Sequence, residues 1–195
     1  MSDAPFRLAS QGADAPAPVL RQVSAQARLD GLLWQMTLRQ TYRNTSPQPL
    51  EVVYTFPLQR EAVLLGFASE LNGQRMQGTI VERKTAEARY EAALSEGDAP
   101  VLLEALDDGL HTANIGNLAP GDEIVLEIRT AQVAAFDNGR IRLQIPTTIA
   151  PRFGDALAAG LQPQQVPQTS VLAEYPLALS VRIGHALTGA TVECP

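Results

Sequence analysis

The chain has little of what holds many small secreted or metal-binding proteins together. One of its 195 residues is cysteine, Cys194, which cannot form an internal disulfide and so excludes a disulfide-framed scaffold. Its two histidines, His111 and His185, stand in different predicted strands. A metal site or a nucleophile–base pair would need both of them close together with carboxylates or Cys194. We therefore expect no metal and no cofactor.

Concentrated positive charge and long apolar runs are missing as well. The formal net charge is −6 and the largest basic cluster is Arg83-Lys84, which argues against a nucleic-acid partner. The longest apolar runs are about five residues, far below the roughly 20 that cross a bilayer, so we expect no membrane insertion. The first 20 residues lack the regions of a signal peptide. We expect a soluble chain and leave its compartment open, because a longer protein containing it could be exported or anchored.

Motifs of catalysis are absent too. The sequence has no G-x-S-x-G, Walker A, G-x-G-x-x-G or H-E-x-x-H motif. Glu82, Glu87 and Glu91 are candidate acid/base carboxylates, but catalysis would need burial to raise the pKa of one of them. The spacing of Glu87 and Glu91 favours an exposed helix face. We therefore expect a protein that is not an enzyme. Asn44-Thr45-Ser46 fits the glycosylation pattern, but we expect it to be a turn.

What the sequence does contain is alternation of apolar and polar residues. Residues 23–29 and 32–42 alternate on either side of Asp30-Gly31, which predicts a hairpin. Residues 62–71 form another predicted strand, with Val63, Leu65, Phe67 and Leu71 on one face, closed by a turn at 72–73. About ten short strands separated by Asp-Gly, Asn-Gly and Pro-Gly predict a mainly β fold, an antiparallel β-sandwich.

One helix interrupts the strands, predicted over about Thr85–Ser95. Residues 86, 90, 93 and 94 repeat at the spacing of one apolar helical stripe. Thr85 is the predicted N-cap and Gly97 the predicted terminator. A helix of about ten residues is not stable alone in water, so we expect its stripe to be packed on the sheet.

These patterns divide the chain into four parts. Residues 1–19 form a flexible N-terminal lead-in, and residues 20–153 form the β-sandwich domain. Residues 154–170 are rich in Gln, Pro and Ala and are predicted to be a loop. Residues 171–195 are predicted to add strands that lead toward a downstream domain outside this chain.

The sequence of the sandwich region resembles the VIT domain, the family found in inter-alpha-trypsin inhibitor heavy chains and vault proteins, in the order and spacing of many residues. The resemblance covers about residues 20–153. The residues that carry it are Tyr42, Asn44, Ser46, Glu51, Tyr54, Phe56-Pro57-Leu58, Ala62, Val63, Phe67, Gly73, Gly78, Ile80, Glu82, Lys84, Ala86, Tyr90-Glu91, Ala93, Gly97, Leu102-Leu103-Glu104, Gly116-Asn117, Pro120-Gly121 and residues 146–153 (PTTIAPRF). His111 stands where the family usually has Phe, so we expect it to pack in the core or at its rim, and we expect His185 to be solvated.

The resemblance implies a non-catalytic module, as in bacterial proteins that join a VIT domain to a von Willebrand A domain. The expected partner is a von Willebrand A domain of the same polypeptide, which the module would dock to or orient. Sheet edges and the exposed helix face, with Arg83, Glu87 and Glu91, would supply the contact surface. The alternative is an extracellular matrix or carbohydrate-binding module.

Arg152 is the polar residue of PTTIAPRF. Its guanidinium can reach a carboxylate bidentately, and we expect a structural ion pair with Glu82 or Glu104 rather than a ligand contact.

Overall fold

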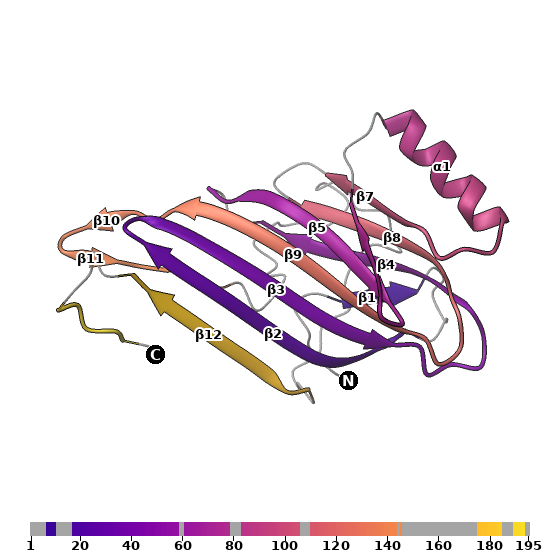
Figure 1. Cartoon of the computed structure of the whole chain (residues 1–195), viewed down its shortest axis with the longest axis horizontal. Coiled ribbons are helices and arrows are strands. Elements are labelled where there is room, and N and C mark those ends of the chain that lie inside the picture. The colour runs from indigo at the N-terminus through magenta and orange to yellow at the C-terminus, as the bar shows by residue number, and fades with distance from the viewer. Residues whose placement is uncertain are drawn as a thin grey trace, which may run out of the picture.

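Two β-sheets lie face to face as layers, with one helix beside them (Figure 1). The computed structural model describes residues 7–10, 17–58, 61–78, 83–105, 110–143, 145, 175–184 and 189–193. The mainly β sandwich with one helix, predicted from the alternation of apolar residues, is confirmed.

The larger sheet has six strands, in the order β12-β2-β3-β9-β5-β6. These are β2 (Val19–Asp30), β3 (Leu33–Arg43), β5 (Val63–Leu71), β6 (Gln74–Gln77), β9 (Glu123–Val133) and β12 (Leu177–Ile183). The smaller sheet has the order β1-β4-β8-β7, made of β1 (Arg7–Ser10), β4 (Leu50–Pro57), β7 (Val101–Ala105) and β8 (Leu110–Leu118). β10 (Phe136–Asp137) and β11 (Arg140–Ile141) form a small hairpin, and α1 spans Arg83–Ser95.

The predicted hairpin turns are confirmed at three places. Gly31, Asn72 and Asn138 each have positive φ, as tight turns between antiparallel strands require. One described pair departs from the predicted antiparallel pattern, because β12 runs parallel to β2. β12 is reached by a long connection rather than by a hairpin, which permits the parallel direction.

Residues at both ends of the chain add strands to the two sheets. β1 lies within the stretch predicted as a lead-in and pairs with β4. β12, in the stretch predicted to lead toward a further domain, continues the six-stranded sheet.

The core fills the space between the two sheets. β2 and β3 contribute alternate residues such as Val23, Leu38 and Tyr42, as their period of two predicts. From the smaller sheet, β4 adds Tyr54 and Phe56, which are at most 1% exposed. A second apolar cluster surrounds Trp34 at the end of the sandwich near β11, with Ala27, Leu29 and Ala134.

The predicted facing of β5 is wrong at its beginning. Val63 and Leu65 are 57% and 50% exposed, whereas Phe67 is buried. The pairing of β5 with β9 shifts register between Leu64 and Gly66, which marks a β-bulge. Because an extra residue reverses the facing of everything before it, Val63 points to the side opposite Phe67.

Helix α1 begins two residues earlier than predicted, so Thr85 lies inside it and is not its N-cap. Arg83 and Lys84 are good helix formers, which allows the helix to extend past Thr85. Its end is confirmed, since Gly97 has φ 85° and donates its N–H to Leu94 O at 3.2 Å.

The predicted apolar stripe of α1 is its half-buried side. Leu94 and Tyr90 lie against Gly116 of β8, where a Cβ would collide with the Leu94 side chain. The Asn117 amide donates hydrogen bonds to Leu94 O at 3.0 Å and to Asp98 O at 2.8 Å. The helix is therefore held on the smaller sheet mainly through its last turn.

The predicted turn at Asn44-Thr45-Ser46 is confirmed, and Asn44 is its centre. Asn44 is completely buried. Its Nδ2 donates to Leu118 O at 2.8 Å and Gln48 O at 2.9 Å, and its Oδ1 accepts from Ser46 N at 2.9 Å. In the folded chain this side chain serves as the anchor of a corner and is not available to a glycan.

Candidate functional site

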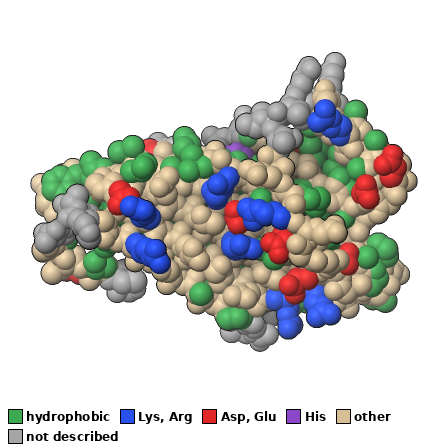
Figure 2. Space-filling view, viewed as in Figure 1, with side chains coloured by type: hydrophobic (Ala, Val, Ile, Leu, Met, Phe, Trp, Pro, Cys, Tyr) green, Lys and Arg blue, Asp and Glu red, His purple; other side chains and the backbone are tan. Residues whose placement is uncertain are grey.

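The outer face of the six-stranded sheet, the side turned away from the smaller sheet, is an open surface (Figure 2). α1 and the smaller sheet both lie on the other side (Figure 1). β3 and β9 run along the middle of the sheet. Their outward pairs, from one end to the other, are Leu33–Val133, Gln35–Ala131, Thr37–Arg129, Arg39–Glu127, Thr41–Val125 and Arg43–Glu123. The face is thus apolar at the Leu33–Val133 end, and three of the other five pairs contain charged residues.

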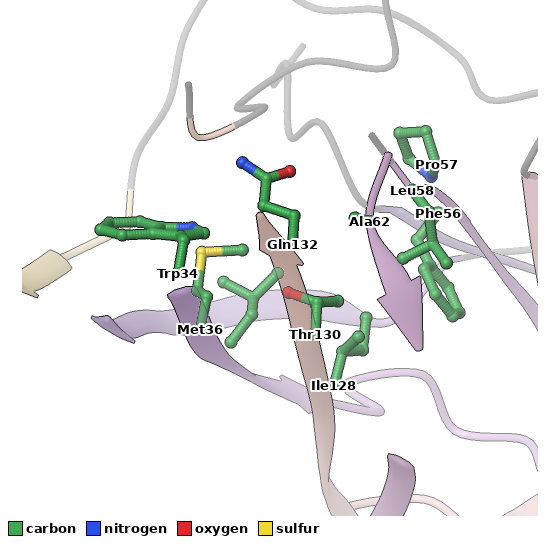
Figure 3. Close-up of a pocket in the computed structure, with 10 residues that line it drawn as sticks. Trp34, Met36, Phe56, Pro57, Leu58, Ala62, Ile128, Thr130 and Gln132 are labelled. Carbon is green, nitrogen blue, oxygen red and sulfur yellow. The ribbon is translucent and has the colours of Figure 1, made fainter. Parts of the chain in front are cut away.

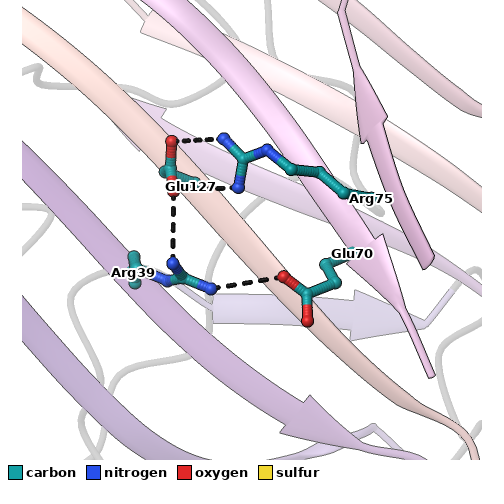
Figure 4. Close-up of polar contacts among 4 residues, drawn as sticks. All are labelled: Arg39, Glu70, Arg75 and Glu127. Carbon is teal, nitrogen blue, oxygen red and sulfur yellow. Dashed lines mark hydrogen bonds and ion pairs between the residues drawn. The ribbon is translucent and has the colours of Figure 1, made fainter. Parts of the chain in front are cut away.

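Glu127 joins the charged groups in the middle of this face (Figure 4). Arg75 donates to its two oxygens at 2.6 and 3.1 Å, and Arg39 Nη1 lies 3.5 Å from Oε2. Arg39 also lies 3.3 Å from a carboxylate oxygen of Glu70. The hydrogen bonds from Arg75 hold the pKa of Glu127 below its usual value, although partial burial opposes this shift. Since Arg75 belongs to edge strand β6, the network fastens that strand to the centre of the sheet.

Arg129 lies flat across the neighbouring strand. A Cβ at Gly66 would stand 2.7 Å from Arg129 Nη2 and 3.3 Å from Nε, so the absence of a side chain at Gly66 makes room for the guanidinium. Among the described residues no ion pair includes Arg129 or Arg182. Both side chains are exposed, although the charge of Arg129 also helps to lower the pKa of nearby Glu127.

An apolar group occupies the end of the outer face beyond Arg129. Leu33 and Val133 are direct cross-strand partners and are 45% and 66% exposed. The bulge in β5 turns Val63 outward. Val63 pairs with Ala131, which is the next outward residue of β9, two residues before Val133. Figure 2 shows hydrophobic side chains gathered at this end of the face, with basic side chains beside them.

The inner side of edge strand β12 is a second uncovered apolar surface. Leu177, Leu179, Val181 and Ile183 lie in register with the buried row of β2 but are 58%, 51%, 43% and 41% exposed. Their alternation along the strand puts all four on one apolar face, which the described residues leave exposed.

A groove lies between the sheets at the end of β4, with a volume of about 420 Å³ including the solvent at its mouth. Trp34 and Met36 line one side, and Phe56 and Pro57 line the other (Figure 3). Among the described residues that line it, the polar side-chain groups belong to Trp34, Thr130 and Gln132, and none of these is an acid or a base. Acid–base chemistry has no support at this place.

Gln40 is a polar residue of the core that the sequence pattern missed. Gln40 is 1% exposed and accepts hydrogen bonds from the hydroxyls of Tyr42 and Tyr54, while its Nε2 has no partner among the described residues. Burial, with Tyr42 adding to it, raises the pKa of Tyr54 well above its usual value. In the sequence, the indication of this buried group was a glutamine at an inward position of β3. Because the oxygen of Gln40 already accepts from both tyrosine hydroxyls, we interpret its role as structural.

The residues predicted for interaction fall on and near α1. Glu91 is exposed and Glu87 is half-buried, while the side chain of Arg83 lies outside the described residues. α1 stands at the end of the molecule opposite β10 and β11 (Figure 1). The role of these three residues stays a prediction.

The predicted ion pair of Arg152 with Glu82 or Glu104 cannot be placed, since Arg152 and Glu82 lie outside the described residues. Glu104, in β7, accepts a hydrogen bond from Asn114 Nδ2 at 3.4 Å.

His111 packs as expected, stacked on Phe56 with ring centroids 5.2 Å apart. His185 and Cys194 lie outside the described residues. In the described part of the chain no three His, Cys, Asp or Glu residues come together as a metal site would require. No helix in that part is long and apolar enough to span a bilayer.

The two packed sheets place this chain in the class of β-sandwich modules, and its exposed apolar and charged side chains lie on open sheet faces. The family model described as "Vault protein inter-alpha-trypsin domain" matches residues 20–130, more than half of the chain. The chain therefore belongs to the VIT domain family, as the resemblance of its motif residues predicted.

Similar proteins come from several eukaryotes. Mouse "Protein mono-ADP-ribosyltransferase PARP4" is 28% identical over 182 residues, which are 91% of this chain and 9% of that protein. The human protein of that name is 30% identical over 73% of this chain and 8% of its own length. Rat "von Willebrand factor A domain-containing protein 5A" is 25% identical over 69% of this chain and 17% of its own length.

The chain thus spans less than a fifth of these relatives. A match to so small a part of the ADP-ribosyltransferases does not show transferase activity for this chain. The predicted bacterial origin has no support from these eukaryotic relatives. Among solved structures, a putative nutrient binding protein from Legionella pneumophila has a TM-score of 0.37 and 12% identity, covering 70% of this chain and 44% of that one.

Proposed function

We propose that this chain is a non-catalytic module that docks to, and orients, a von Willebrand A domain of the same polypeptide. Two findings support the pairing: the chain belongs to the VIT family, and relatives that match it are named for von Willebrand A domains. The observation that carries the proposal is the exposure of apolar surfaces at the outer face and at β12, where large aliphatic side chains of the described residues are 41–66% exposed. Contiguous exposed apolar groups of this kind are typical of surfaces that another protein covers.

Docking within one polypeptide needs only modest intrinsic affinity. A short linker gives the second domain an effective concentration of about 1 mM, so a contact with a Kd near 100 μM would still be about nine-tenths formed. The VIT module would thereby fix the orientation of the neighbouring domain without needing a large interface.

The test compares the linked pair with its separate parts. NMR relaxation of a polypeptide containing this chain and the von Willebrand A domain encoded with it should show both domains tumbling as one body, and the separated domains should bind in titration calorimetry. Independent tumbling of the linked domains, with no heat of binding between the separate ones, would contradict the proposal. The carbohydrate alternative has little structural support, since Phe136 is the one aromatic ring more than a third exposed among the described residues.

A further inference from the structure

We propose that the docking surface is one end of the outer face, and that the surface it binds on the von Willebrand A domain is acidic around an apolar centre. The inference rests on the proposed function and adds to it the site and the chemistry of the partner surface. We call this site the outer-face patch and define it as Leu33, Val63, Val133, Arg129 and Arg182.

The register of the strands places these five residues in three adjacent rows. Leu33 and Val133 form the first row. The second row crosses the sheet from Arg182 on β12, past the middle strands, to Val63 on β5. Arg129 stands in the third row. With strands about 4.8 Å apart, the second row spans roughly 19 Å from Arg182 to Val63. Beside Leu33 in the first row lies Asp30, which is paired with Arg28.

This arrangement has the composition of a protein interface. Interfaces have an apolar centre within a polar rim, and arginine is enriched in them. Val133 and Val63 are more than half exposed, so covering them is favourable by the hydrophobic effect. The position of Arg129 is fixed by the space above Gly66, which lowers the conformational entropy that its guanidinium loses on binding.

The charges decide what kind of partner fits. Arg28, beside Arg182 in the second row, is paired with Asp30 at 2.5 Å. Arg129 and Arg182 have no ion pair among the described residues, although the chain as a whole is acidic. A second copy of the chain would bring arginines against arginines, and nucleic acid would leave the aliphatic centre unused. A protein surface with carboxylates around an apolar centre matches both features.

The other candidate surfaces fit less well. The apolar row of β12 carries no charge that would select a partner, since Arg182 points to the opposite side of that strand. The exposed side of α1 carries acidic Glu91 and lies far from the outer-face patch (Figure 1).

The experiment measures the affinity of the separate von Willebrand A domain for variants of this chain by titration calorimetry. The double variant Arg129→Glu, Arg182→Glu should weaken binding about tenfold or more, and Val133→Glu should weaken it similarly. Raising the salt concentration should weaken the wild type more than the double variant, because the arginine contacts are screened. Circular dichroism melting checks that each variant is folded.

Arg43→Glu is the matched control. Arg43 is exposed on the same face and has no ion pair among those described, but it lies ten residues from Leu33 along β3, roughly 33 Å away. It should change the affinity less than twofold. The pair Leu179→Glu, Val181→Glu tests the β12 row, and Glu91→Lys tests the helix face.

The outcomes separate the two proposals. If the wild type does not bind, the proposed function itself fails. If it binds and the patch variants bind equally well while the β12 or helix variants weaken, the docking function stands and the outer-face patch is wrong. A wild-type dimer in light scattering that Val133→Glu disrupts would assign the patch to a second copy. Binding of a single-stranded RNA oligonucleotide that the double variant abolishes would assign it to nucleic acid. Either result overturns the inference.

Discussion

Replacing Glu127 with glutamine tests whether the charge network stabilises the six-stranded sheet. The substitution keeps the shape of the side chain and removes its charge. Arg75 would keep at most one of its two hydrogen bonds, now to a neutral oxygen, and Arg39 would lose its ion pair at 3.5 Å. Because Arg75 is part of edge strand β6, the loss should destabilise the pairing of that strand with β5 as well as the whole fold.

The magnitude follows from the exposure of the partners. Hydrogen bonds to charged groups contribute about 1.5–3 kcal/mol when buried, and exposed ion pairs contribute about 0.2–1 kcal/mol. The Glu127 side chain is 10% exposed, but those of Arg75 and Arg39 are 44% and 41% exposed. We therefore expect Glu127→Gln to lower the free energy of unfolding by about 1–2 kcal/mol, and the melting temperature by roughly 2–8 °C.

The pH dependence gives the sharper test. The folded pKa of Glu127 lies below its usual value of 4.5, so its charged form stabilises the folded state above that pH. The stabilisation is complete at pH 7 and is lost as the pH falls through the folded pKa. In urea unfolding, the difference between wild type and Glu127→Gln should therefore shrink below about pH 4.5.

Glu70→Gln is the control for this prediction. Glu70 has a single 3.3 Å contact with Arg39 and its side chain is 29% exposed, so its replacement should cost less than about 0.5 kcal/mol. Equal stability of Glu127→Gln and wild type at pH 7, or a difference that persists unchanged in acid, would show that the charge of Glu127 does not stabilise the sheet.

Three further predictions concern the corner, the helix and a tyrosine. Asn44→Asp keeps the size of the side chain but turns an acceptor oxygen toward two main-chain carbonyl oxygens. In urea unfolding, the free energy of unfolding should fall by about 2–4 kcal/mol. An unchanged free energy of unfolding would show that these hydrogen bonds do not stabilise the corner. Gly116→Val should push Leu94 away, so amide exchange should speed up in α1 but not in β2 and β3; unchanged exchange in α1 would contradict the packing. Burial raises the pKa of Tyr90 to about 12 from a usual 10.0. Between pH 10 and 12 the hydroxyl therefore ionises more readily in the unfolded chain, so the free energy of unfolding should fall there, and Tyr90→Phe should remove part of that fall. An ultraviolet titration that gives Tyr90 a pKa near 10 would contradict this expectation.

Features with a local cause could be predicted from the sequence. Alternation placed Val23 and Leu38 in the core, and Asp30-Gly31 and Asn72-Gly73 placed two hairpins, because each pattern acts over a few neighbouring residues. The stripe of α1 and its end at Gly97 followed from equally local rules.

Features that depend on partners far away in the sequence could not be predicted. The bulge in β5 depends on how β9 pairs with it, and Val63 faces outward only because of that bulge. Glu127 and Arg75 are separated by 52 residues, and single-sequence patterns do not indicate that they meet. Gly66 provides the space over which Arg129 lies, a contact between strands that are far apart in the sequence. The residues of the candidate docking surface are brought together by the register of the strands, and no sequence motif marks them.

The most direct test of docking through the outer face is a crystal structure of this chain together with the von Willebrand A domain of its own polypeptide. We expect carboxylates of that domain within 4 Å of the guanidinium groups of Arg129 and Arg182, and apolar side chains covering Val63 and Val133. A structure in which the two domains touch elsewhere and the outer face stays in solvent would contradict it.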